Sequence, residues 1–94
     1  MAGEGRLQKF FKQHAKDNDV LWRKIKFEGR RGCPDTLLVY EGRVMLVELK
    51  NPNKQGKLSK AQTNETNRLK LAGVDVRIIN SREEIENAIR FITR

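Results

Sequence analysis

The fold is decided by the stretch from Gly32 to Lys50, which reads GCPDTLLVYEGRVMLVELK. Two apolar segments, residues 36–40 and 43–49, are separated only by Glu41 and Gly42. Because glycine accepts positive φ without steric cost, a two-residue loop with glycine second favours a tight primed turn. The stretch therefore predicts an antiparallel hairpin in which residues whose numbers sum to 83 face each other.

This register brings two carboxylates together. Asp35 lies directly across from Glu48, and Lys50 projects from the same face as Glu48. Facing carboxylates about 5 Å apart repel each other, so the pair predicts a hard divalent cation bound through oxygens. A neighbouring lysine could orient a water or stabilise negative charge on a phosphate.

A plainer interpretation of the same residues stays open. Asp35 would be an ordinary turn residue after Pro34, and Glu48 and Lys50 would form an ion pair at the end of a strand. The metal interpretation depends on the register, because a slip of one residue turns the side chains of one strand to the other face.

Length and charge set the broad class. With 94 residues the chain has room for one domain, residues 1–94. Twenty Lys and Arg against twelve Asp and Glu give a net charge of +8 and a pI near 10.1. Such an excess in a globular pattern indicates a polyanionic partner, most often nucleic acid; a merely basic, soluble surface is the alternative.

Composition also excludes several classes. Cys33 is the only cysteine, so an intrachain disulfide is excluded, and with one histidine a closed structural zinc site is disfavoured. No apolar run approaches the ~20 residues that span a bilayer. The first residues lack the apolar core of a signal peptide, which favours a cytoplasmic protein.

Periodicity predicts the elements around the hairpin. A helix over residues 4–16 carries an apolar stripe, and a strand over 20–27 precedes the hairpin. A second helix begins at Ser59 and ends before Gly73, a strand follows over 74–79, and a last helix begins after Ser81. Both Ser59 and Ser81 have Gln or Glu three residues later, the pattern of a capping box. The apolar positions are Leu7, Phe10, Phe11 and His14 in the first helix, Leu58, Ala61, Leu69 and Ala72 in the second, and Ile85, Ala88, Ile89 and Ile92 in the last.

The predicted order is therefore α-β-β-β-α-β-α, an α/β fold with a central antiparallel hairpin. A final strand reached through a helix predicts a mixed sheet, with helices on both faces.

Several residues outside the hairpin are ambiguous. The carboxylate of Glu4 could interact favourably with the positive N-terminal end of the first helix, or it could supply a third carboxylate to the metal site. Arg30 and Arg31 could grip phosphates or form a solvated arm. Trp22 is expected to anchor the core, with stacking on a base as the alternative, and Cys33 is expected to be a small packing residue.

The ordered motifs resemble a known family. Gly-Cys-Pro-Asp at 32–35 followed by Glu-Leu-Lys at 48–50 resembles the PD-(D/E)xK nuclease signature. The remaining matches identify the chain as similar to a VRR-NUC domain, specifically the stand-alone virus-type form, over essentially its whole length. They are Gly32 before the Pro-Asp pair, the segment Gly56, Leu58-Ser59 and Gln62, and Gly73-Val-Asp-Val.

The resemblance implies roles for individual residues and a restriction-endonuclease-like fold. Asp35 and Glu48 would be ligands of Mg²⁺ or Mn²⁺ together with the backbone carbonyl of Leu49, and Lys50 would be the catalytic lysine. Gln62 would join the site, its side chain alternating between that role and the helix cap, and Glu4 would complete the metal environment. Glu65 departs from the pattern, because a bulky apolar residue is expected about there.

The implied activity is metal-dependent hydrolysis of DNA phosphodiesters. For a stand-alone member it would be a homodimer cutting branched DNA such as Holliday junctions, as in DNA repair, in the cytoplasm of a bacterial host if the chain is viral. Two alternatives remain, a sequence-specific restriction-type endonuclease and a non-catalytic basic DNA-binding module. The basic residues expected to track the DNA backbone without reading bases are Arg30, Arg31, Lys54 and Lys57.

Overall fold

The computed structural model describes residues 3–50 and 58–94, with residues 3 and 4 described by their backbone alone. The elements follow the predicted order α-β-β-β-α-β-α. They are α1 (Gly3–Asp17), β1 (Leu21–Lys24), β2 (Thr36–Tyr40), β3 (Arg43–Leu49), α2 (Lys60–Leu71), β4 (Val76–Ile79) and α3 (Arg82–Ile92).

The central hairpin has the predicted turn and register. Glu41 and Gly42 both have positive φ, 47° and 83°, which is the backbone of a primed turn. The pairs from Thr36–Val47 to Tyr40–Arg43 all sum to 83. The turn chemistry therefore determines which face of the sheet each side chain occupies.

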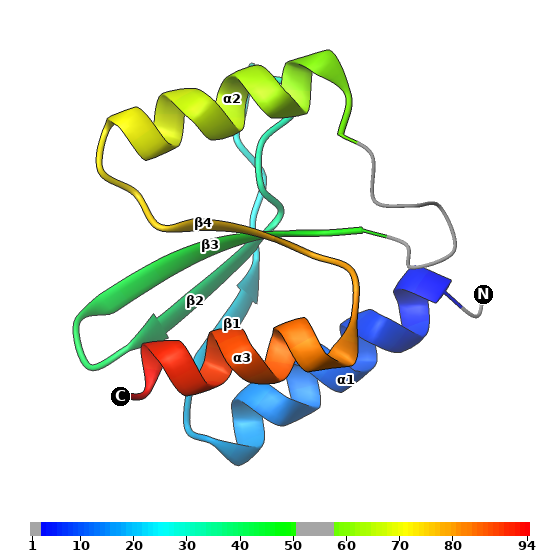
Figure 1. Cartoon of the computed structure of the whole chain (residues 1–94), viewed down its shortest axis with the longest axis vertical. Helices are drawn as coiled ribbons and strands as arrows, with labels where there is room; N and C mark the ends of the chain where they lie inside the picture. Colours follow the sequence, from blue (N-terminus) through cyan, green and yellow to red (C-terminus); the bar gives the residue numbers. More distant parts are fainter. Residues whose placement is uncertain (1–2, 51–57) are drawn as a thin grey trace.

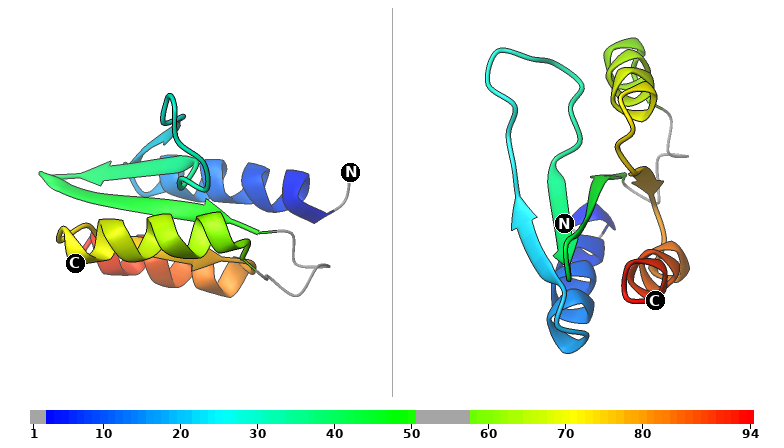
Figure 2. Two further views of the ribbon diagram at one scale, coloured as in Figure 1. Left: turned by 90° about the horizontal axis from the view of Figure 1, so that it is seen from above. Right: turned by 90° about the vertical axis from the view of Figure 1, so that its left-hand side faces the viewer.

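The described strands form one sheet in the order β1-β2-β3-β4. β1 and β2 pair antiparallel, as do β2 and β3, whereas β3 and β4 pair parallel. The chain reaches β4 through α2, because a parallel neighbour needs a crossover. In Figures 1 and 2, α2 lies on one face of the sheet and α1 and α3 lie on the other, so the mixed, two-sided α/β sheet is confirmed.

Two strands are shorter than predicted. β1 ends at Lys24, where its partner β2 begins, instead of continuing to residue 27; proline at position 34, with no N–H to donate, precedes that start. β4 begins at Val76 because Val74 still belongs to the end of α2. The N–H of Val74 bonds to the carbonyl of Leu69 and that of Gly73 to Lys70, the two bonds of a Schellman motif.

The main core lies between the sheet and the α1–α3 layer. α3 contributes all four predicted apolar residues, and α1 contributes Leu7 and Phe11. Phe10 and His14 are only half buried and stack on each other, with ring centroids 5.4 Å apart, while Ala15, not predicted, is fully buried. The sheet side of this core consists of Leu38, Met45, Val47, Leu49 and Ile79.

The last helix begins with a shifted version of the predicted capping box. Ser81 Oγ accepts from the N–H of Glu84 at 3.2 Å, as expected. The Glu84 carboxylate accepts from the N–H of Asn80 at 2.7 Å, one residue before the cap.

Each helix in the described part of the chain is too short or too polar to pass through a lipid bilayer.

Candidate active site

Asp35 is fixed at the entrance to β2 by its neighbours. It follows the buried Pro34, and its backbone carbonyl accepts from the N–H of Ile25 at 2.9 Å. Its Oδ1 accepts from the hydroxyl of Thr36 at 3.2 Å, and its Oδ2 accepts from Lys24 Nζ at 2.9 Å. Both carboxylate oxygens are thus directed by groups from β1 and β2.

Glu48 and Lys50 lie at the end of β3, two residues apart. Lys50 Nζ lies 3.8 Å from Glu48 Oε2. Glu48 is only 9% exposed, and a carboxylate so buried is expected to be held by hydrogen bonds and a cation. Gln62 of α2 supplies such a bond, because its Nε2 donates to Glu48 Oε2 at 3.0 Å.

Gln62 joins the helix cap to the acidic site. Its Oε1 accepts from Lys50 Nζ at 2.7 Å and also from the backbone N–H of Ser59 at 2.9 Å. The N–H of Gln62 donates to Ser59 Oγ at 3.1 Å, which completes the predicted capping box. One conformation of Gln62 makes both the cap contacts and the contacts to Glu48 and Lys50, so these contacts need no alternation between conformations.

These groups gather at one end of the sheet. The last pair of the β2–β3 hairpin on this side is Thr36–Val47, and Asp35 and Glu48 are the next residues of the two strands. Asp35 contacts Lys24 and Thr36, whereas Glu48 contacts Gln62 and Lys50. The N-terminal ends of α1 and α2 lie on the side of the molecule where β3 ends (Figures 1 and 2). The side chain of Glu4, expected here, lies outside the described residues.

The oxygen donors fit a hard divalent cation. Within the part of the chain that the structure describes, no three His, Cys, Asp or Glu side chains come together as a metal site. Two carboxylates suffice for Mg²⁺, because this ion keeps several of its waters and binds proteins through only one or two carboxylates. Asp35 and Glu48 are the two carboxylates that would supply these oxygens, and each of them contacts a lysine.

Gly32, in the loop before Asp35, is in close contact with the first turn of α2. Its φ is +73°, and a Cβ placed there would lie 2.4 Å from the carbonyl carbon of Ala61 and 2.6 Å from the nitrogen of Gln62. No side chain fits at such distances. The glycine of the Gly-Cys-Pro-Asp motif thus lets the loop pack directly against the turn that carries Gln62.

The same loop is tied to α2 by ion pairs. Arg30 Nη2 lies 2.8 Å from Glu65 Oε1, and Arg68 Nη1 lies 3.5 Å from the same oxygen. The hydrogen bond from Arg30 lowers the pKa of Glu65 and raises the pKa of Arg30. Glu65, which replaces the expected apolar residue, is therefore a buried anchor for the loop.

The α2 seam differs from the predicted one for this reason. Its buried residues are Glu65 and Thr66, whereas Leu58, Ala61 and Leu69 are half buried and Ala72 is exposed. Cys33 packs as expected, and burial raises the pKa of its thiol, so the thiol stays protonated at neutral pH.

The predicted phosphate-binding residues occupy different situations. Arg31 is exposed, and Arg30 is half exposed while paired with Glu65. Lys54 and Lys57 lie outside the described residues.

Sequence reasoning missed Lys24 and Gln8. Gln8 of α1 accepts from Lys24 at 3.2 Å, and Lys24 in turn donates to Asp35. The signal was present in the alternation of β1, because Lys24 lies two residues from Trp22 on the same face. Its pairing with β2, which brings it to Asp35, is a long-range register that local pattern does not reveal.

No family model matches the sequence, and no curated protein matches it. A solved structure described as "VRR_NUC domain" matches with a TM-score of 0.83 and 32% sequence identity. The match covers 93% of this chain and 94% of that chain. The two chains therefore share one fold over nearly their whole lengths.

Proposed function

The chain belongs to the VRR-NUC family, which gives it a nuclease-type function on DNA, and we propose that it is a metal-dependent endonuclease selective for branched DNA such as Holliday junctions. One observation carries this proposal. Glu48, Lys50 and Gln62 form a hydrogen-bonded group at the end of β3, and continuing the β2–β3 register by one pair would bring Asp35 next to Glu48. An acid pair with an adjacent, oriented lysine is the set of groups that phosphodiester hydrolysis needs.

Asp35 and Glu48 would hold Mg²⁺ or Mn²⁺. The backbone carbonyl of Leu49 and the carboxylate of Glu4 would supply further oxygens. When bound, the ion would polarise the phosphate and make a water more acidic. Lys24 donates a hydrogen bond to Asp35 at 2.9 Å and so orients this carboxylate.

Lys50 would act on the reacting groups. Its side chain is 18% exposed, and its Nζ lies 2.7 Å from Gln62 Oε1. From there it would orient the attacking water or stabilise the charge that develops on the phosphate. Gln62 acts through Lys50 and Glu48, so it is a positioning residue.

Binding of the DNA backbone would rest on the basic surface around this site. Arg31 is exposed one residue before Gly32, and Lys54 and Lys57 follow the hairpin in the sequence. Arg30 would contribute less, because Glu65 already neutralises it. Arginine and lysine contacts to phosphates fix the register of the protein on DNA and do not read bases.

A homodimer would supply two such sites, one for each of two strands of a junction. An apolar row on the sheet supports this part of the proposal. Leu21 lies beside Val39, which lies beside Val44, on three successive strands. Leu21 is 43% exposed and Val44 is 51% exposed. An uncharged row on so basic a chain is suited to a second copy, whose identical row would cover it.

The experiment that tests the proposal is a cleavage panel with the wild-type chain. Its substrates are a four-way junction, a flap, linear duplex and single strand, each with Mg²⁺, with Mn²⁺ and with EDTA. We expect metal-dependent cutting of the branched substrates and no cutting in EDTA. Cutting at one sequence in linear duplex would contradict structure selectivity, and binding without cutting in every metal would contradict catalysis.

A further inference from the structure

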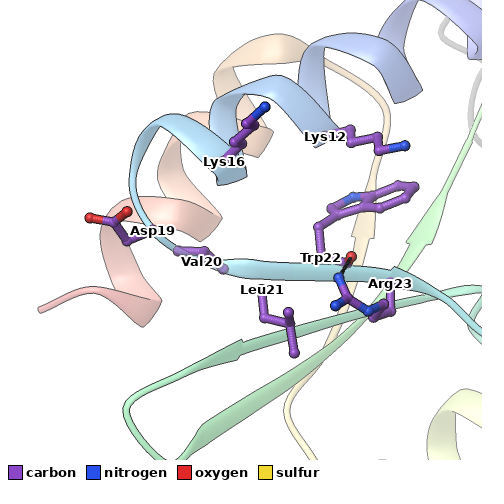
Figure 3. Close-up of a pocket in the computed structure, with 7 residues that line it drawn as sticks. All are labelled: Lys12, Lys16, Asp19, Val20, Leu21, Trp22 and Arg23. Carbon is purple, nitrogen blue, oxygen red and sulfur yellow. Dashed lines mark hydrogen bonds between the residues drawn. The ribbon is translucent and has the colours of Figure 1, made fainter.

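A cavity away from the acidic site lies between α1 and the outer strand β1 (Figure 3). Its volume is about 370 Å³. The residues that line it are Lys12, Lys16, Asp19, Val20, Leu21, Trp22 and Arg23. None of them has a role in the site described above.

The lining combines an indole ring with cations. Trp22 is half buried, and its ring meets Phe11 edge-on with centroids 6.1 Å apart, so the core fixes its orientation. Lys12 Nζ lies over the ring, 5.6 Å from its centroid. In Figure 3, Lys12 and Lys16 lie on the α1 side of the cavity, whereas the carboxylate of Asp19 points away from the indole.

This cavity connects to the acidic site along two rows of residues. Trp22 and Lys24 lie on one face of β1, about 7 Å apart. Gln8, Lys12 and Lys16 are spaced four residues apart on α1 and so form one stripe. The rows meet where Lys24 donates both to Gln8 and to Asp35. A single strand of DNA that runs from the acidic site along β1 would therefore pass the indole of Trp22.

We propose that this cavity binds an unpaired nucleotide of single-stranded DNA that flanks the cut strand, with its base on Trp22 and its phosphates on Lys12 and Lys16. The proposal rests on the nuclease function proposed above and adds a second DNA contact to it. Base–aromatic stacking tolerates any base, because every base has a π-face. Lys12 leaves the ring when the base arrives and pairs with the adjoining phosphate.

Trp22 is the only tryptophan of the chain, so tryptophan fluorescence excited selectively over Tyr40 comes from this cavity. The probe is a short oligothymidylate, titrated in EDTA so that no cutting occurs, with binding measured in parallel by anisotropy of a labelled copy. We expect saturable quenching that follows the anisotropy. Heparin, a polyanion without bases, is expected to bind without that quenching.

Charge variants on α1 give the matched comparison. Lys12→Gln is expected to lower the slope of log affinity against log salt by about 0.7, one single-strand phosphate contact. Lys9→Gln removes the same charge from the same helix, but Lys9 is exposed beside Arg6, Phe10, Gln13 and Arg82, in a different hollow. That control is expected to leave the slope unchanged. Because Trp22 packs on the core, Trp22→Leu is used only if its unfolding transition is retained, and a loss of about tenfold in affinity is then expected.

Several results would overturn the proposal. They are binding without quenching, equal quenching by heparin or by blunt duplex, and equal effects of the two lysine variants. None of these results contradicts the nuclease function if the wild-type chain still cuts the branched substrates. Normal quenching by the oligothymidylate, with no cutting of branched DNA in Mg²⁺ or Mn²⁺, would contradict the nuclease function instead.

Discussion

At the scale of single residues, Gly32 has no room for a side chain, whereas Gly29 in the same loop has open space around it. The missing side chain of Gly32 lets the loop pack against the backbone of Ala61 and Gln62. A methyl group there would push away the α2 turn that holds Gln62 against Glu48 and Lys50. The glycine thus matters for where the helix lies as well as for its own φ.

Gly32→Ala is therefore predicted to reduce the cleavage rate on the order of a hundredfold, the cost of misplacing reacting groups by about 1 Å. Gly29→Ala is the control, because Gly29 has the same φ of +73° with nothing within 4 Å of its added Cβ. Gly29→Ala therefore has the same strain of an alanine at positive φ, but its methyl group meets no neighbouring atoms. Cleavage kinetics and urea unfolding of both variants separate the two effects, and equal rates for the two would contradict the account.

Residue patterns alone single out much of the candidate site, whose catalytic roles stay predictions. Asp35, Glu48 and Lys50 follow from hairpin register and strand alternation, and Gln62 follows from its capping box and from the family resemblance. Lys24 and Gln8 could not be predicted, because their contact depends on how α1 and β1 pack at the sheet edge. The double role of Gln62 also needed the structure, since a cap does not show what the rest of the side chain reaches.

At the scale of elements, α2 is held to its loop by charge more than by apolar packing. Glu65 has a side chain that is 8% exposed and pairs with Arg30 and Arg68. The capping box of Ser59 and Gln62, together with Gly73, predicted where α2 begins and ends. Helix periodicity failed on the buried face, because an ion pair to a distant loop leaves no apolar stripe in the sequence.

Glu65→Gln is predicted to destabilise the fold at neutral pH and to matter progressively less in acid. The folded pKa of Glu65 lies below its ordinary value of about 4.3. The stabilisation by its charge is thus fully present above that value and is lost as the pH falls through the lowered pKa. Urea unfolding of wild type and variant from pH 7 to pH 3 should show a difference in unfolding free energy that shrinks below about pH 4.3.

The control for this series is Glu86→Gln, which removes a carboxylate from the exposed side of α3. It is expected to leave the unfolding free energy close to wild type at neutral pH. A Glu65 difference that stays constant down to pH 3 would contradict the ion-pair explanation.

At the scale of the whole molecule, the sheet has unequal coverage. α1 and α3 bury one face in a continuous core, whereas the row of Leu21, Val39 and Val44 on the other face stays partly open. Element order and sheet type followed from periodicity and chain connectivity. The exposure of the row of Leu21, Val39 and Val44 could not be predicted from the sequence, because it depends on where α2 lies over the sheet.

Val44→Asp is predicted to convert a wild-type dimer to a monomer, since it places a charge on the most exposed residue of the apolar row. Leu71→Asp is the control, because Leu71 is 89% exposed at the end of α2 and lies outside the row. Light scattering at micromolar concentration gives the mass of each. A wild-type monomer would contradict the proposed homodimer, and a Val44→Asp dimer would contradict an interface through this row.

The most direct measurement of the central claim is cleavage of a four-way junction in Mg²⁺ or Mn²⁺ by the wild-type chain, Glu48→Gln and Glu86→Gln, each repeated with EDTA. Glu48→Gln keeps the size of the side chain and removes the charge that would hold the ion. We predict that it binds the junction, stays folded and cuts no faster than the EDTA background, while Glu86→Gln cuts at the wild-type rate. Cutting by Glu48→Gln at the wild-type rate would contradict the assignment of this site.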